Sequence, residues 1–212
     1  LPQALPALLD AARATMVTRG NEDALRRIAL ALGNAGAAES GQMFADRYAE
    51  ACRALHRSPM PLRWPLRTAD KALRVGILTG EAGDADALRA VLSDAGLDDN
   101  VRCTVLAAAD ASTLPGVDAV KDLPAFGDAA ARSIATLDLD VLIDLAGTRL
   151  ASGPLLALHP ARVLWSVARP ETPALRAFAD RMFTDARAFP GALASDPRGL
   201  PSCVREWHRA AA

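Results

Sequence analysis

Polar residues that could bind a ligand gather behind two apolar segments, residues 140–146 (DVLIDLA) and 162–167 (RVLWSV). A carboxylate at the end of a buried strand could act as a general base or bind a ribose hydroxyl. A threonine and an arginine nearby could hold a phosphate or a substrate hydroxyl. The candidate ligand-binding residues are Asp144, Gly147, Thr148, Arg149 and Arg169.

Each of these side chains also has an ordinary structural explanation. Asp144 could cap the turn that follows it instead of contacting a ligand, since aspartate often accepts hydrogen bonds from nearby backbone amides. Arg149 and Arg169 could simply lie in solvent on their loops. The sequence leaves both interpretations open.

The three histidines predict no acid–base catalysis, although histidine is the commonest acid or base near neutral pH. His56 ends a helical pattern, His159 precedes a proline at a second helix end, and His208 lies near the end of the chain. Helix capping explains the first two better than catalysis. We therefore assign no catalytic residue from the sequence.

The three cysteines, Cys52, Cys103 and Cys203, are widely separated and show no CxxC or Cys/His spacing. Neither a disulfide framework nor a zinc site is indicated. The loop of residues 80–84 (GEAGD) lacks the full G-x-G-x-x-G pattern, and its two acidic residues would repel a phosphate. The sequence thus predicts an ordinary capped turn there, with no metal and no cofactor.

The elements that must position the candidates alternate between apolar runs and helical patterns from Leu73 onward. This alternation predicts right-handed crossovers and an α/β fold, a Rossmann-like doubly wound parallel sheet. Strands are expected at residues 73–79, 101–107, 117–123, 140–146, 162–167 and 181–185. Helices are expected at residues 84–95, 125–137, 154–158 and 172–179.

A small all-helical segment precedes this lobe. Residues 1–57 show three stretches with apolar residues at helical spacing, similar to the end of a helical repeat array such as a tetratricopeptide array. Residues 58–72 contain three prolines in SPMPLRWPL and are expected to be a connector. The predicted organisation is therefore helices at 1–57, a connector at 58–72 and a Rossmann-like lobe at 73–212.

Composition limits the classes of partner. The chain has 212 residues, 51% of them hydrophobic, and a formal net charge of -1, which gives no general attraction to nucleic acid or to acidic membranes. No apolar run approaches the length needed to cross a bilayer. Unpaired cysteines favour a reducing, cytoplasmic location. The chain begins with Leu1, and from this we expect a piece of a longer protein.

Four segments in order, LRVGILT, DLDVLIDLAG, LLALHPARVLWS and ADRMFTDARAFP, resemble the first catalytic lobe of the O-linked N-acetylglucosaminyltransferases. The resemblance covers residues 73–190, and the preceding helices resemble that family's passage from tetratricopeptide repeats into its catalytic region. The enzymes of that family move N-acetylglucosamine from a UDP-sugar to serine or threonine. The resemblance implies their two-lobed glycosyltransferase architecture of GT-B type, but not their activity.

The chain departs from the family at its loops. The loop of residues 80–84 holds no histidine where the family has one, and VARPET (167–172) replaces a Gly-Tyr-Pro-Gly-Thr segment. The family also binds the UDP-sugar chiefly in a second lobe, for which 212 residues leave no room. Because loops carry chemistry while strands specify fold, we expect a degenerate lobe that is non-catalytic alone and acts as a binding or scaffolding module.

The expected partner is another protein or a second glycosyltransferase lobe. The alternative is an excised half of an active UDP-N-acetylglucosamine-dependent protein O-glycosyltransferase whose donor-binding lobe lies elsewhere. A third hypothesis is an unrelated nucleotide-binding α/β domain.

Overall fold

The computed structural model describes residues 7, 10, 18–56, 62, 73–79, 101–106, 117–123, 126–145, 150–167 and 173–183. The helices within these ranges are α2 (Arg19–Asn34), α3 (Ala38–Leu55), α5 (Asp128–Ala135) and α6 (Gly153–Leu156). The strands are β1 (Leu73–Leu78), β2 (Val101–Leu106), β3 (Ala119–Lys121), β4 (Val141–Asp144), β5 (Val163–Val167) and β6 (Arg181–Phe183).

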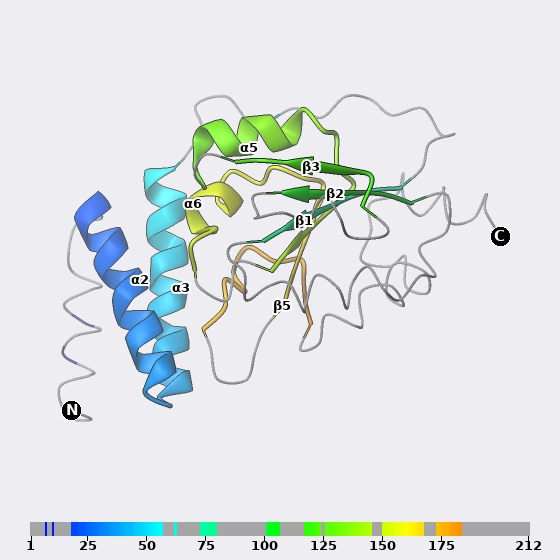
Figure 1. Ribbon diagram of the computed structural model, residues 1–212. Helices are drawn as coiled ribbons and strands as arrows, with labels where there is room; N and C mark the ends of the chain where they lie inside the picture. The colour runs from blue at the N-terminus through cyan, green and yellow to red at the C-terminus, as the bar shows by residue number, and fades with distance from the viewer. Residues whose placement is uncertain are drawn as a thin grey trace.

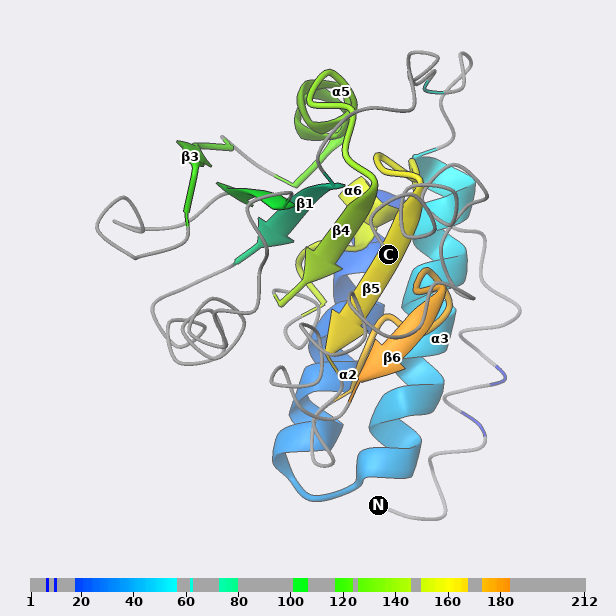
Figure 2. The same ribbon diagram turned by 90° about the vertical axis from the view of Figure 1, so that its right-hand side faces the viewer.

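The six strands form one sheet in the order β3-β2-β1-β4-β5-β6, and every neighbouring pair is parallel. Figure 2 shows the strands side by side with their arrowheads at one edge. This order is that of a Rossmann-like sheet, in which the chain winds outward first on one side of β1 and then on the other. The predicted fold class is confirmed.

A helical hairpin precedes the sheet and packs on one of its faces. Helix α2 begins after Thr18, whose side chain accepts a hydrogen bond from the amide of Asn21, and α3 returns antiparallel to it (Figure 1). The buried residues of α3 include Phe44, Tyr48 and Cys52, spaced four apart along one side of the helix. That apolar stripe turns α3, and with it the hairpin, toward the sheet.

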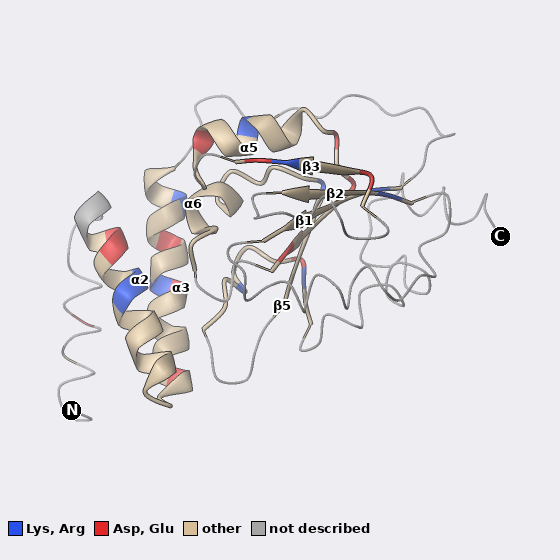
Figure 3. Cartoon of the chain, in the orientation of Figure 1, with Lys and Arg blue, Asp and Glu red and all other residues tan. Residues whose placement is uncertain are grey.

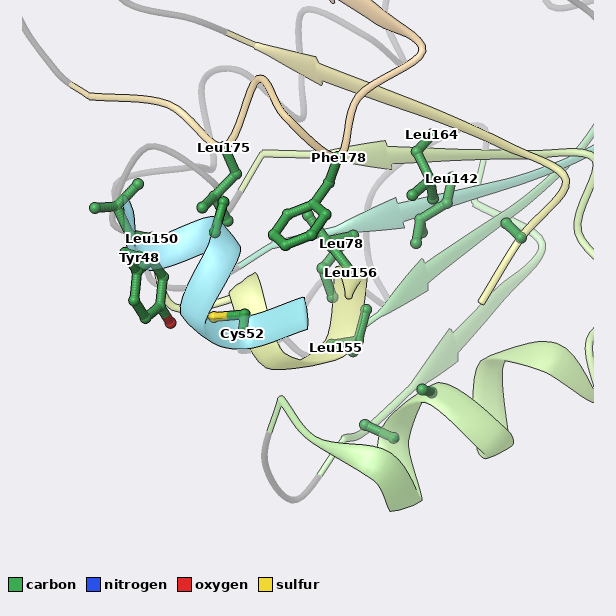
Figure 4. Close-up of a cluster of buried hydrophobic side chains, with 14 of the residues drawn as sticks. Tyr48, Cys52, Leu78, Leu142, Leu150, Leu155, Leu156, Leu164, Leu175 and Phe178 are labelled. Atoms are coloured by element: carbon green, nitrogen blue, oxygen red, sulfur yellow. The ribbon is translucent and has the colours of Figure 1, made fainter. Parts of the chain in front are cut away.

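The core lies between the sheet and helices α3, α5 and α6. Leu78, Leu106, Leu142 and Leu164 come from four neighbouring strands and belong to the same cluster as the apolar residues of these helices. Figure 4 shows Leu78, Leu142 and Leu164 beside Tyr48 and Cys52 of α3 and Leu155 and Leu156 of α6. The intervening strand residues, such as Ile77 and Ile143, are also buried. Strands buried on both faces require the continuous apolar runs seen in the sequence.

A network of buried charges lies at the amino edge of the sheet, opposite the edge at which ligands bind in such folds. The Asp138 carboxylate accepts hydrogen bonds from Arg74, at 3.1 Å, and from Arg162. Arg162 also donates to the Leu139 carbonyl at 3.3 Å, and its Nη1 lies 3.8 Å from the fully buried Asp140. These contacts join the starts of β1, β4 and β5.

All six predicted strands are present, and so are the predicted helices at residues 125–137 and 154–158. The second and third predicted N-terminal helices correspond to α2 and α3. The helix at 84–95 and most of the first N-terminal helix lie outside the described residues, as does the connector apart from Leu62.

The helix predicted at residues 172–179 is wrong, because residues 173–180 form irregular chain and a turn before β6. The backbone of Ala174 is already hydrogen-bonded to a side chain of α3: its N–H donates to Gln42 Oε1 at 3.0 Å, and its carbonyl accepts from Gln42 Nε2 at 2.9 Å. The amides of Phe178 and Ala179 then bond three residues back, to Leu175 and Arg176. The contact of Ala174 with Gln42 of α3 thus takes the place of the hydrogen bonds that a helix would form at this residue.

Candidate functional site

The carboxyl edge of the sheet between β1 and β4 is the first candidate site. These two strands are neighbours, yet the chain visits β2 and β3 between them, so the crossovers diverge at this point. Open α/β sheets bind their ligands in the crevice that such a divergence leaves outside the carboxyl ends of the strands. Asp144 ends β4 here, beside Leu78 of β1 and Ser166 of β5.

Asp144 is buried and forms hydrogen bonds within the lobe. Its Oδ2 atom accepts from the Ser152 hydroxyl at 3.0 Å, and its backbone carbonyl accepts from the Ser166 hydroxyl at 3.3 Å. Only 1% of Asp144 is exposed. The bond to Ser152 ties the end of β4 to the residue that precedes α6.

Hydroxyl groups surround this position, and the sequence interpretation overlooked them. Thr79 follows β1 and donates through its amide and its hydroxyl to the carbonyl of Leu106, at 3.1 and 3.4 Å. Thr79, Ser152 and Ser166 are all buried. A hydroxyl residue at or just after the end of an apolar strand was the signal that could have found Thr79 and Ser166.

The other predicted ligand-binding residues, Gly147, Thr148, Arg149 and Arg169, lie outside the described residues. On the described side of the gap, Leu145 donates its amide to the Leu78 carbonyl at 2.8 Å and thereby extends the pairing of β4 with β1. On the far side Leu150 is buried with a φ of 58°. The residues on either side of the predicted loop, Leu145 and Leu150, are therefore held in the lobe.

Helices α2 and α3 meet the lobe at a second candidate site, formed around Glu22. This carboxylate lies in the first turn of α2, and its Oε1 atom is 3.2 Å from Cys52 Sγ of α3 and 2.9 Å from His56 Nε2. His56 directly follows α3, and its amide is bonded to the Cys52 carbonyl. The sequence did not indicate its pairing with Glu22, which is 34 residues away.

Tyr48 and Cys52 of α3 contact α6 without room to spare. A Cβ atom added to Gly153 would lie 2.8 Å from the Tyr48 hydroxyl and 2.9 Å from Cys52 Sγ, so only glycine fits there. Burial raises the pKa of both the Tyr48 phenol and the Cys52 thiol far above their ordinary values, which keeps both groups neutral.

An open pocket of about 380 Å³ lies beside this contact. We call it the junction pocket, since its walls come from the hairpin and from the lobe. It is lined by Glu22, Asp23, Arg26, Tyr48, Phe126, Ala151 and Pro154. Figure 3 colours acidic and then basic residues one after another along the first turns of α2.

In the described part of the chain, no three His, Cys, Asp or Glu side chains are grouped so that they could hold a metal ion. The helices described in the structure are also too short or too polar to cross a membrane.

No protein-family model matches the chain, and no curated protein matches it either. The fold of the chain is established by its parallel six-stranded sheet.

Proposed function

We propose that this chain is a glycosyltransferase-like N-terminal lobe, related to the first lobe of the O-linked N-acetylglucosaminyltransferases. We further propose that it is not catalytic alone, that it serves as a binding or scaffolding module, and that its location is cytoplasmic. Its partner is a second protein or a second glycosyltransferase lobe.

The observation that carries the family assignment is where the four resembling segments fall. LRVGILT covers β1, DLDVLIDLAG contains β4, LLALHPARVLWS runs from α6 into β5, and ADRMFTDARAFP contains β6. These are four successive parts of one Rossmann-like sheet, and a packed helical hairpin precedes them. The combination of hairpin and lobe is what the resemblance requires.

The binding role is supported by how firmly the hairpin is held. Gln42 of α3 bonds to both backbone groups of Ala174, and Asp46 of the same helix pairs with Arg176. Arg53 donates to the Ala177 carbonyl and lies over the Phe178 ring, 4.9 Å from its centroid. A hairpin fixed in this way presents one rigid surface to a partner, which limits the entropy lost on binding.

The absence of catalysis is supported by Asp144, the acidic residue at the carboxyl edge. A general base must reach the proton that it removes. The Asp144 carboxylate is instead buried and accepts a hydrogen bond from Ser152. The sequences after β1 and β5 also support a non-catalytic role, because they lack the family's histidine and its Gly-Tyr-Pro-Gly-Thr segment.

A transfer assay tests this proposal. The purified chain is incubated with labelled UDP-N-acetylglucosamine and serine- and threonine-containing peptides, and we expect no labelled peptide. Transfer that is lost in an Asp144→Asn variant with unchanged folding would overturn the proposal in favour of an active transferase.

The alternative, half of an active enzyme whose donor-binding lobe lies elsewhere, requires a partner lobe that binds UDP. Adding a separately purified candidate lobe to the same assay distinguishes the two functions. Transfer by the mixture, with none by either part alone, would support the alternative; binding between the parts without transfer would support the scaffolding role.

A further inference from the structure

We propose that the junction pocket binds an arginine side chain of a partner protein, with Glu22 as the residue that pairs with the guanidinium group. This inference stands on the pocket between α2, α3 and α6. It does not depend on the proposed function at the carboxyl edge of the sheet.

Glu22 supplies the charge. The hydrogen bonds from Cys52 and His56 both end on its Oε1 atom, and within the described residues no donor reaches Oε2. Because Glu22 lines the pocket, Oε2 is the oxygen that remains for a ligand. A carboxylate with only 8% of its residue surface exposed interacts more strongly with a cation than one in open solvent does.

The other charges of the pocket largely cancel. Asp23 accepts a hydrogen bond from Arg26 at 3.0 Å and lies 2.6 Å from Arg27, and these arginines hold the pKa of its carboxyl below the ordinary value. Tyr48 is neutral, and so is Cys52 behind it. His56 Nε2 lies 2.9 Å from Glu22 Oε1, the oxygen that Cys52 also contacts. The pocket is therefore suited to a single positive charge.

The shape and composition of the walls favour arginine over lysine. Tyr48 and Phe126 both line the pocket, and the half-buried Phe126 ring can stack on a guanidinium plane that also donates to a carboxylate. The volume of about 380 Å³ exceeds a guanidinium group, which leaves room for the side-chain stem and part of a peptide backbone. We therefore assign the ligand to a protein and not to a free small cation.

The test is a titration of the whole chain at pH 8 with the peptide acetyl-Gly-Arg-Gly-amide, followed by NMR of the backbone amides. We expect saturable shifts at Glu22, Tyr48 and Phe126, and at least about tenfold weaker binding of the peptide in which citrulline replaces arginine. Equal binding of the citrulline peptide would overturn the assignment of a cationic ligand.

Two substitutions with opposite expected effects separate recognition from folding. Glu22→Gln keeps the shape of the side chain but should weaken binding at least about tenfold, since a charge-assisted bond is lost. Arg26→Gln removes a cation that lines the pocket, and it should strengthen binding. If Arg26→Gln abolishes binding and Glu22→Gln does not, the pocket binds an anionic or neutral group and the proposal is wrong.

Glu50→Gln is the matched control, because Glu50 is an exposed acid on α3 that pairs only with Arg47 among the described residues. It should leave the affinity unchanged. Butylguanidinium serves as the small-molecule probe. Weaker binding than that of the arginine peptide supports a protein partner, whereas equal binding would overturn that part of the assignment.

Discussion

Asp140 and Arg74 are joined by two hydrogen bonds that close the amino end of the pairing between β4 and β1. The Arg74 amide donates to Asp140 Oδ2 at 2.9 Å, and the Asp140 amide donates to the Arg74 carbonyl at 2.9 Å. Both backbone groups of Arg74 are thus satisfied by one residue. The Asp140 carboxylate therefore accepts the hydrogen bond that a backbone carbonyl would accept if β4 began earlier in the chain.

The same arrangement occurs twice more in the sheet. Asp118, directly before β3, bonds to the amide and carbonyl of Cys103, at 2.6 and 2.9 Å. Asp180, directly before β6, does so with Leu164, at 2.7 and 2.8 Å. An aspartate before a strand therefore helps to fix the register of three of the parallel pairs.

Replacing Asp140 should be the costliest change of this kind. Asp140 is fully buried, and its loss would remove the carboxylate that lies 3.8 Å from Arg162 and leave the Arg74 amide without its acceptor. Breaking a buried charge pair typically costs about 3–5 kcal/mol, so we expect Asp140→Ala to lower the free energy of unfolding by about that amount. Urea denaturation followed by circular dichroism measures it.

Two further variants serve as comparisons for Asp140→Ala. Asp118→Ala should cost less, about 1 kcal/mol, because its side chain is 35% exposed and water can replace the lost partner. Asp128→Ala removes an exposed carboxylate of α5 and should change stability by about 0.5 kcal/mol or less. If Asp140→Ala is no more damaging than Asp128→Ala, the hydrogen bonds do not hold the sheet edge.

Gly153→Ala should loosen the contact between α3 and α6. The new Cβ atom would meet the Tyr48 ring at 2.7 Å and Cys52 Sγ at 2.9 Å, and both side chains are buried. Overpacking of this kind costs about 1–3 kcal/mol. Thermal unfolding should show the loss, and the near-ultraviolet circular dichroism of Tyr48 should change with it.

Gly127→Ala is the matched control for this substitution. Gly127 precedes α5, and a Cβ atom there would meet nothing within 4 Å. A stability change as large as that of Gly153→Ala would show that steric conflict with Tyr48 and Cys52 is not the cause.

The sequence predicts the sheet well because its signals are local. The apolar runs that become β1, β4 and β5 are interrupted by helical patterns of the length that a crossover needs, so a parallel sheet was the natural prediction. The helix predicted at residues 172–179 failed because Gln42, more than 130 residues away, binds the backbone of Ala174. Such a tertiary contact leaves no trace in the local pattern.

The candidate sites also differ in whether a local sequence signal or a tertiary contact defines them. Asp144 was found because a carboxylate at the end of an apolar strand is a local signal. Glu22 was not, since its role depends on contacts with His56 and Cys52 that form only when α2 packs on α3. The junction pocket requires that packing and the docking of α6 as well.

Gln42→Ala should weaken the attachment of the hairpin to the lobe. It removes two hydrogen bonds to Ala174 and a third, at 2.9 Å, to Asp46. We expect a loss of about 1–3 kcal/mol, because the amide and carbonyl of Ala174 would have to find new partners. Hydrogen exchange should speed up at Ala174, whereas a Glu50→Ala control should leave that amide protected.

The Cys103 thiol should make stability depend on pH in the alkaline range. Burial, with a smaller effect of the Asp118 charge, raises the pKa of Cys103 from 9.0 to about 12. Above pH 9 the unfolded chain therefore releases this proton while the folded chain keeps it, so stability falls as pH rises from about 9 to 12.

The contribution of one such group should approach about 1.4 kcal/mol per pH unit between those limits. Cys103→Ala isolates it, because every other titrating group, Cys52 included, remains in both proteins. In urea denaturation between pH 8 and 10.5 we expect the stability advantage of the parent chain over Cys103→Ala to shrink steadily above pH 9. A constant difference across that range would mean that the Cys103 thiolate forms as easily in the folded chain as in the unfolded one.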